Sequence, residues 1–273
     1  MLTYNRPQLI GRAIESIEKQ TLQDWELIVV QDGKNEHTIQ VVGEWAARDT
    51  RVKHLRRDKG GNIANATNHG LRAATGKYIA ILDDDDCWIT EKKLERQVEF
   101  LEKNPDYVGC GSGMIAIDEA GNETLKFLKP ETDADIRQNA LFANPMTHST
   151  GMYRRSAIEQ IGLYDETLAG FQDWDVWLKL GKLGKLYNFP EYFCYYQIWE
   201  GSGSFQAPLG NTRSALKIVR RHKDTYRGFP VALTMAYAYH TYAHLPLGIR
   251  KASYSFLSRL KKSFFSGGRS SAA

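Results

Sequence analysis

The sequence predicts an α/β protein whose mostly parallel mixed sheet is covered by helices and followed by a helical C-terminal tail. Through the first hundred residues, patterns typical of helices alternate with patterns typical of short buried strands. Such alternation builds a parallel sheet with helices on its faces. A second observation is the run "AILDDDDCW", in which four aspartates, Asp83 to Asp86, directly follow an apolar stretch. Because ligands bind at the carboxyl ends of strands in open α/β sheets, this run is expected at a ligand-binding edge.

Each element expected before Pro105 rests on a local pattern. The helix expected over residues 6–20 places its apolar residues on one face and has Pro7 in its first turn. The run 77–82 has the length of a parallel strand that is buried on both faces. Thr90 is expected to cap the helix that follows at 90–104. The other expected helices span 38–49 and 60–76, and the other expected strands span 25–33 and 51–57.

The pattern changes after Pro105. The segments 107–118 and 123–128 predict a hairpin around "EAGN". Helices are expected over 133–142, 154–162 and 172–184, and a strand is expected over 186–199. The tail from Asn211 predicts helices that are broken at Gly228–Pro230 and at Pro246.

Composition excludes several classes of protein. The chain has 273 residues, of which 42% are hydrophobic and 25% charged, as in an ordinary globular protein. No basic, apolar leader opens the sequence, so no secretion signal is expected. Cys87, Cys110 and Cys194 are odd in number and scattered, which fits neither a disulfide framework nor a zinc site. They are expected to be buried thiols in a reducing cytoplasm.

The net charge of +4 conceals an asymmetry. From Arg213 to the end, the chain has 12 Lys and Arg but a single acid, Asp224, whereas the preceding 212 residues have 24 bases and 31 acids. The tail therefore carries +11 and the body −7. The acidic body is expected to bind cations or neutral ligands, and the tail is expected to face an anionic partner.

The mutual repulsion of the four aspartates must be offset by a positive charge or by solvent. Two carboxylates ~4 Å apart repel by about 4 kcal/mol at an effective dielectric near 20. Asp32 ends another expected strand, so these acids converge on one edge, where Mg²⁺ or Mn²⁺ would relieve the repulsion. No EF-hand loop fits, because its required glycine would fall on Trp88 or Ile89. The alternative is a solvated, acidic entry to the helix that follows.

Four segments occur in one order with suitable spacing: "TYNRP", "VVQDG", "NHGLRAATGKYIAILDDDD" and "GFQDWDVWLKL". Together they resemble the family 2 glycosyltransferases, which use nucleotide sugars and have the Rossmann-like GT-A fold. The resemblance covers about residues 1–204. It implies a nucleotide-sugar-binding half over 1–105, an acceptor-binding half of the same domain over 106–204, and a separate basic helical tail over 205–273.

The resemblance also implies where a donor would bind. Thr3, Tyr4 and Asn5 would line the base pocket, with Tyr4 as a stacking face. Asp32 would accept a hydrogen bond from the base, and Asn68 lies in a further donor-binding motif.

The resemblance implies a specific role for each residue of the aspartate run. Asp83 and Asp85 form a DxD motif, with Asp83 near the ribose and Asp85 ligating Mn²⁺ or Mg²⁺, and both are assigned to the metal. Asp84 is grouped with the donor-binding residues, and Asp86 would hold hydroxyls of the donor sugar.

On the acceptor side, Asp173 corresponds to the general base, and Gln172 stands where the family usually has glutamate. Asp173 falls in the first turn of an expected helix, where the helix dipole favours its ionised form, and Asp175 is the local competitor for the role. His148 and Trp174 are candidate acceptor contacts, although a structural histidine and a packed tryptophan are the ordinary alternatives.

Three departures from the family pattern stand out. Thr67 replaces an arginine of the donor motif. "YQIW" (196–199) lacks the histidine often found after the last strand. Only Met1 and Leu2 precede "TYN", where relatives have several apolar residues of an interior strand. We therefore expect unpaired ladder groups there and a native chain that starts upstream of Met1.

Together these features predict a metal-dependent, inverting hexosyltransferase. It would move a sugar from a nucleotide-diphosphate donor, which we expect to be a UDP-sugar, onto a hydroxyl of a glycan or lipid-linked glycan. The expected role is in bacterial lipopolysaccharide, O-antigen or capsule synthesis. The alternatives are a sugar nucleotidyltransferase and a catalytically degenerate nucleotide-sugar binder. No nucleic-acid partner is expected. The tail predicts a cytoplasmic protein peripheral on an anionic membrane, or else a soluble helical cap on the body.

Overall fold

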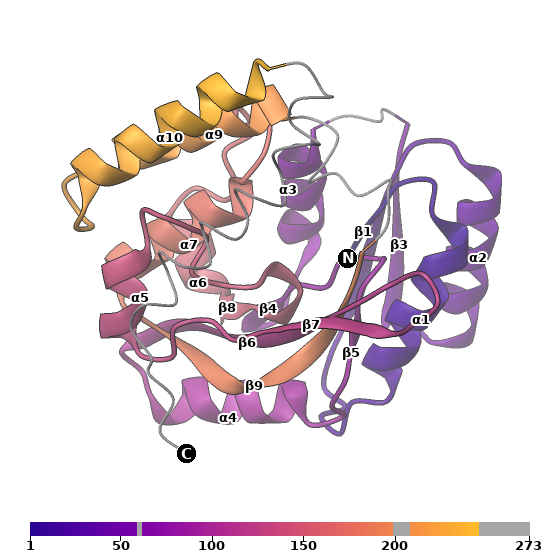
Figure 1. Ribbon diagram of the computed structural model, residues 1–273. Helices are drawn as coiled ribbons and strands as arrows, with labels where there is room; N and C mark the ends of the chain where they lie inside the picture. Colours follow the sequence, from indigo (N-terminus) through magenta and orange to yellow (C-terminus); the bar gives the residue numbers. More distant parts are fainter. Residues whose placement is uncertain (59–61, 199–207, 246–273) are drawn as a thin grey trace.

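The computed structural model describes residues 1–58, 62–198 and 208–245 (Figure 1). Its first part is a parallel sheet with strand order β1 (Leu2–Thr3), β2 (Leu27–Asp32) and β3 (Val52–Arg57). Helices α1 (Pro7–Glu18) and α2 (Glu36–Arg48) connect these strands. All six residues of β2 are buried, which explains why that segment reads as an apolar run.

The second sheet is mixed. Its strands follow the order β4 (Tyr78–Ala80), β8 (Met152–Arg154), β6 (Tyr107–Ile117), β9 (Lys185–Gln197) and β5 (Cys87–Trp88), and β7 (Glu123–Phe127) pairs with β6 as the expected hairpin. β6 and β9 run parallel, and the other pairings are antiparallel. The remaining helices of the body are α3 (Ile63–Ala73), α4 (Lys93–Lys103), α5 (Asp133–Asn139), the 3₁₀ turn η1 (His148–Thr150), α6 (Arg155–Gln160) and α7 (Gln172–Leu183).

The two sheets are separated beside β1. The predicted parallel pairing of the 77–82 strand is wrong, because β4 pairs only with β8 in the described residues, and antiparallel. A cavity of about 630 Å³ lies between β2 and β4, with Leu2, Ile28, Val30, Ile79 and Ile81 in its lining. The break in the ladder thus falls where the short first strand was expected to leave pairing groups unused.

Helix α4 begins later than predicted. Its first residue is Lys93, and Lys92 occupies the N-cap position without a side-chain hydrogen bond. Thr90 is therefore not the cap; its hydroxyl accepts a weak hydrogen bond from the Lys92 amide at 3.3 Å instead. The three cysteine thiols are free and buried, as expected.

Two helices of the tail, α9 (Pro208–Arg221) and α10 (Phe229–Ala243), pack on the body beside α7 (Figure 1). Ile218 and Val219 of α9 are buried in one apolar cluster with Trp174 and Leu178 of α7. The predicted break falls at Gly228, whose positive φ of 83° favours glycine. The break predicted at Pro246 lies outside the described residues.

In the described part of the chain, no helix is long and apolar enough to cross a membrane. The helix α10 has only 15 residues, fewer than the roughly 20 that a bilayer requires.

Candidate active site

The four consecutive aspartates alternate between two environments. Asp84 and Asp86 are buried, with exposed fractions of 0% and 2%, whereas Asp83 and Asp85 are partly exposed. The chain leaves β4 at Ala80 and turns at Asp83 and Asp84 before it enters β5 at Cys87. Along the run, each buried aspartate is thus followed or preceded by a partly exposed one. The buried and the partly exposed carboxylates can therefore contact different partners, which reduces the repulsion between neighbours.

The two inner carboxylates are fixed by the protein. Asp86 accepts hydrogen bonds from the Ser149 hydroxyl at 2.5 Å and from the Gln197 backbone amide at 3.2 Å. Asp84 forms an ion pair with Arg6 at 2.8 Å. Burial raises the pKa of Asp84 to about 7, although Arg6 opposes the shift. Burial also raises the pKa of Asp86, and the charges of Asp83 and Asp85 add to that rise.

Two arginines from the first helix region supply positive charge to the acidic turn. Arg6 Nη1 donates to Asp85 Oδ2 at 2.5 Å, so a single guanidinium contacts both Asp84 and Asp85. Arg12 Nη2 donates to the Asp85 carbonyl oxygen at 2.9 Å and to Gln197 Oε1 at 2.7 Å. In this structure, Arg6 pairs with the Asp85 carboxylate, to which the sequence assigned a metal ion.

The exposed pair suits a divalent cation that arrives with a phosphate ligand. Asp83 and Asp85 offer hard carboxylate oxygens, but no group of three or more metal-ligating side chains is found in the described residues. Mg²⁺ is usually held by one or two carboxylates together with substrate phosphates and water. The donor set therefore fits a metal that the protein and a diphosphate hold jointly.

The predicted base pocket lies at the end of β2. Asp32 is 5% exposed, and its Oδ1 lies 3.7 Å from Arg57 Nε. The Tyr4 ring is 52% exposed and lies close to Gly33, where an added Cβ would stand 3.2 Å from the ring. An exposed aromatic face beside a shielded carboxylate could stack on a base and accept a hydrogen bond from its edge. Thr3 is buried beneath Tyr4, and Asn5 is exposed in a positive-φ turn.

Asp173 faces the same region from the first turn of α7. Its Oδ2 accepts a hydrogen bond from Asn144 Nδ2 at 2.6 Å, and the residue is partly exposed. Burial raises the pKa of the Tyr164 phenol well above its usual range, and the charges of Asp173 and Asp83 add to the shift. The segment 144–149 links the two acids, because Asn144 donates to Asp173 and the Ser149 hydroxyl lies 3.3 Å from Asp83 Oδ2. His148 lies there too, 4.0 Å from Asp83 and edge-on to Tyr164.

Comparison with known proteins agrees with this geometry. The family model described as glycosyl transferase family 2 matches residues 1–162, more than half of the chain. The chain is a family 2 glycosyltransferase. EpsE of Bacillus subtilis (strain 168) is 32% identical over 207 residues, 74% of this chain and 72% of EpsE. The amylovoran biosynthesis glycosyltransferase AmsE of Erwinia amylovora is 31% identical over 183 residues, 66% and 68% of the two chains.

Solved structures of low sequence identity share the fold. The mannosyltransferase PcManGT from Pyrobaculum calidifontis, in complex with GDP-Man and Mn²⁺, has a TM-score of 0.64 at 19% identity, covering 94% of this chain and 78% of PcManGT. Residues 1–349 of S. aureus TarS, in complex with UDP-GlcNAc, also give 0.64, at 17% identity and with 96% and 76% coverage. In a structure of a longer TarS chain, the matched part covers 43% of TarS. The predicted GT-A fold is thereby confirmed.

Four of the residues assigned to ligands from the sequence have structural roles in this glycosyltransferase. Asn68 donates to the Tyr164 carbonyl and to Glu166, and its own oxygen accepts from the Tyr164 amide. Trp174 is 6% exposed, donates to the Ala140 carbonyl and packs in one apolar cluster with residues of the tail helices. Asp84 and Asp86 are buried, the first paired with Arg6 and the second hydrogen-bonded to Ser149. In this conformation, none of the four presents its side chain to a ligand.

Several residues that complete the site were missed. Arg6 lies inside the quoted "TYNRP", and a search for a base to balance the aspartates could have found it. No feature of the local sequence could have identified the other three residues, Ser149, Asn144 and Tyr164, because nothing near them distinguishes them from other polar residues. Only the fold brings them to the acidic turn and to Asp173.

Because Arg6 balances Asp85, it should compete with a metal for that carboxylate. At an effective dielectric near 20, two opposite charges ~4 Å apart attract by about 4 kcal/mol, and partial exposure reduces this to about 1 kcal/mol. Arg6→Gln should therefore tighten the binding of Mn²⁺ alone roughly five- to tenfold, measured by calorimetry or by the electron paramagnetic resonance signal of free Mn²⁺. Arg56→Gln, an exposed change on β3, is the control. Unchanged or weaker Mn²⁺ binding by Arg6→Gln would refute the competition.

Proposed function

We propose that this glycosyltransferase moves a sugar from a nucleoside-diphosphate donor to an acceptor hydroxyl with inversion at the anomeric carbon and with the help of Mn²⁺ or Mg²⁺. The observation that carries the proposal is that one segment, residues 144–149, contacts both groups of acids: Asn144 donates to Asp173 on α7, and the Ser149 hydroxyl lies 3.3 Å from the partly exposed Asp83. It supplies an anchor for the leaving diphosphate and a separate carboxylate for the acceptor.

The reaction needs both parts. A bound divalent cation would neutralise charge that develops on the departing nucleoside diphosphate. Asp173 takes the proton of the acceptor hydroxyl, whose oxygen attacks the anomeric carbon as the bond to the diphosphate breaks. The Asn144 amide donates to Asp173 and orients its carboxylate. Direct displacement needs no covalent enzyme intermediate.

We further propose a UDP-sugar as the donor. Tyr4 would stack on the uracil, and Asp32 would accept a hydrogen bond from its N3–H. Solved relatives of the same fold are described with UDP-GlcNAc and with GDP-Man and Mn²⁺, which supports a nucleotide-sugar donor and a metal. The similarity to AmsE, an amylovoran biosynthesis enzyme, supports a role in bacterial surface polysaccharide synthesis, with a glycan or lipid-linked glycan as the acceptor.

Two variants separate the two halves of the mechanism. Asp173→Asn should bind UDP with Mn²⁺ as the wild type does but lose turnover by roughly 10²-fold or more, because only the proton acceptor is removed.

Asp85→Asn should lose the metal-dependent part of UDP binding, because the cation loses a charged ligand. Binding is measured by calorimetry, and turnover by release of UDP from a panel of UDP-sugars. Near-normal turnover by Asp173→Asn, or metal-dependent UDP binding by Asp85→Asn, would sink the corresponding assignment.

We also propose that the tail docks the enzyme on an anionic membrane, on the inner face of the plasma membrane. Exposed apolar and aromatic side chains of α10 support this proposal. The helix has no charged residues, and Val231 and Tyr239 are 58% and 57% exposed. Arg220, Lys223 and Arg227 are exposed next to it. Lys217 and Arg221 instead pair with acids of the body, so fewer bases are available to lipid than the tail's charge of +11 indicates.

Membrane docking can be tested by flotation with liposomes. The full chain should float with phosphatidylserine-containing liposomes, but not with neutral ones, and high salt should release it, because each surface base contributes about 1 kcal/mol. Lys223→Glu/Arg227→Glu should abolish flotation. Lys19→Glu/Lys92→Glu, with the same change in net charge on the body, should not. Equal flotation of the two double variants would contradict a docking surface on the tail.

A further inference from the structure

The start of α7 is not fixed by its own sequence. Phe171 occupies the N-cap position with φ 57° and ψ 24°, a left-handed conformation that is uncommon for a residue with a side chain. It makes no side-chain capping hydrogen bond. Asp173 follows two residues later, so its direction depends on the contacts that hold the segment in front of the helix as well as on the buried residues of α7 itself.

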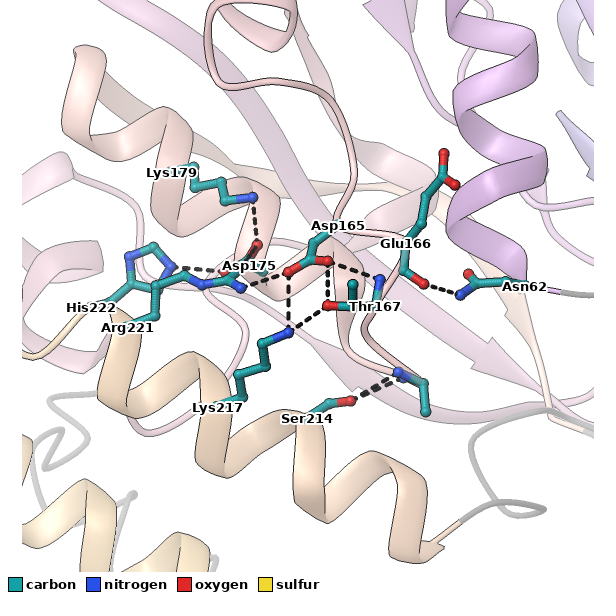
Figure 2. Close-up of polar contacts among 12 residues, drawn as sticks. Asn62, Asp165, Glu166, Thr167, Asp175, Lys179, Ser214, Lys217, Arg221 and His222 are labelled. Carbon is teal, nitrogen blue, oxygen red and sulfur yellow. Dashed lines mark hydrogen bonds and ion pairs between the residues drawn. The ribbon is translucent and has the colours of Figure 1, made fainter.

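Helix α9 holds that segment (Figure 2). The Ser214 hydroxyl accepts hydrogen bonds from the backbone amides of Ala169 at 3.1 Å and Gly170 at 3.3 Å. A Cβ at Gly170 would overlap the Asn211 side chain of α9, which would then have to move, so the two segments lie in close contact here. The backbone just before Phe171 is thus fastened to a helix that lies more than 40 residues later in the chain.

A second attachment joins the same helix to α7 itself. Arg221 donates to Asp165 at 2.6 Å and to Asp175 at 2.7 Å, so one guanidinium links the loop before α7 to the first turn of α7 (Figure 2). His222 Nε2 lies 2.9 Å from the other oxygen of Asp175, and Lys179 adds an ion pair at 2.8 Å. Asp175 is fully buried. Burial alone would raise its pKa, but hydrogen bonds from His222 and Lys179 lower the pKa to about 2.

The two aspartates of the first turn have opposite directions. Residues two apart on an α-helix lie about 200° apart around the axis, so a turn that buries Asp175 against α9 presents Asp173 on the other side. Asp173 accordingly contacts Asn144 and is partly exposed. Anchoring Asp175 therefore fixes the rotation of the turn that carries Asp173.

We propose that Ser214 and Arg221 of α9, with His222 directly after it, are positioning residues for Asp173, and that the α9 helix is a part of the catalytic apparatus. We call this set of contacts the α9 clasp. The inference rests on the proposed role of Asp173 as the base. It extends the functional unit beyond residues 1–162, which the family model matches.

The clasp is tested first without substrate. Hydrogen exchange of the full-length protein is followed by mass spectrometry in Ser214→Ala, which removes one acceptor, and in Arg221→Lys, which as a point charge cannot span both acids. In each variant, amides of residues 165–175 should exchange at least tenfold faster, whereas those of β2 should not change. Arg213→Ala, an exposed change on the same helix, is the control and should match the wild type. Unchanged exchange at 165–175 in both variants would overturn the proposal.

A second measurement separates positioning from general loosening. Hydrolysis of the UDP- or GDP-sugar that the wild type cleaves fastest with Mn²⁺ is compared in wild-type, Ser214→Ala, Asp173→Asn and double-variant proteins. Ser214→Ala should lower kcat roughly tenfold and leave the donor KM within about twofold. In the Asp173→Asn background it should have no further effect, because both changes act through one carboxylate.

The outcomes distinguish the two proposals. Additive losses from Ser214→Ala and Asp173→Asn would overturn the clasp as a positioning device while keeping Asp173 as the base. Full activity of Asp173→Asn, or no hydrolysis of any donor by the wild type, would contradict the proposed function instead.

Discussion

Mutual repulsion among four consecutive carboxylates is the constraint around which this enzyme is built. Neighbouring charges of this kind would repel by about 4 kcal/mol at ~4 Å and an intermediate dielectric. The fold meets the constraint by alternation. Asp84 and Asp86 point inward to Arg6, Ser149 and the Gln197 amide, and Asp83 and Asp85 remain partly exposed. The contacts of Asp84 and Asp86 fix the conformation of the turn. The carboxylates of Asp83 and Asp85 remain accessible to a cation.

The same division between an inner and an outer carboxylate recurs on α7. Asp175 is buried and paired with Arg221 of α9 and with Lys179 of α7, whereas Asp173 is partly exposed and hydrogen-bonded to Asn144. In both places a buried acid with protein partners lies one or two residues from a partly exposed acid. The tail helices therefore matter to the first turn of α7 because Arg221 supplies part of the positive charge that its buried acid requires.

Much of this could be predicted from the sequence, because it depends on local pattern. The helices of the body, its longer strands and the place of Asp173 in the first turn of a helix follow from periodicity, and the family follows from the resemblance of four motifs. The strands β5 and β8 could not be predicted, because each is too short to show a pattern. The directions of Asp86 and Trp174 could not be predicted, because each depends on a partner distant in the chain: Ser149 lies 63 residues after Asp86, and the Ala140 carbonyl 34 residues before Trp174. The share of the tail's charge that is available to an anionic partner could not be predicted either, because part of that charge meets Asp165 and Asp175 of the body itself.

The central claim is that Asp83 and Asp85 form the cation site and that Arg6 occupies it when no metal is present. Anomalous diffraction from crystals that contain Mn²⁺ and UDP tests this directly. The account predicts an anomalous peak bonded to the Asp85 carboxylate and to the diphosphate, with the Arg6 guanidinium moved away from Asp85. A peak elsewhere, or a metal-bound site in which Arg6 still donates to Asp85, would contradict it.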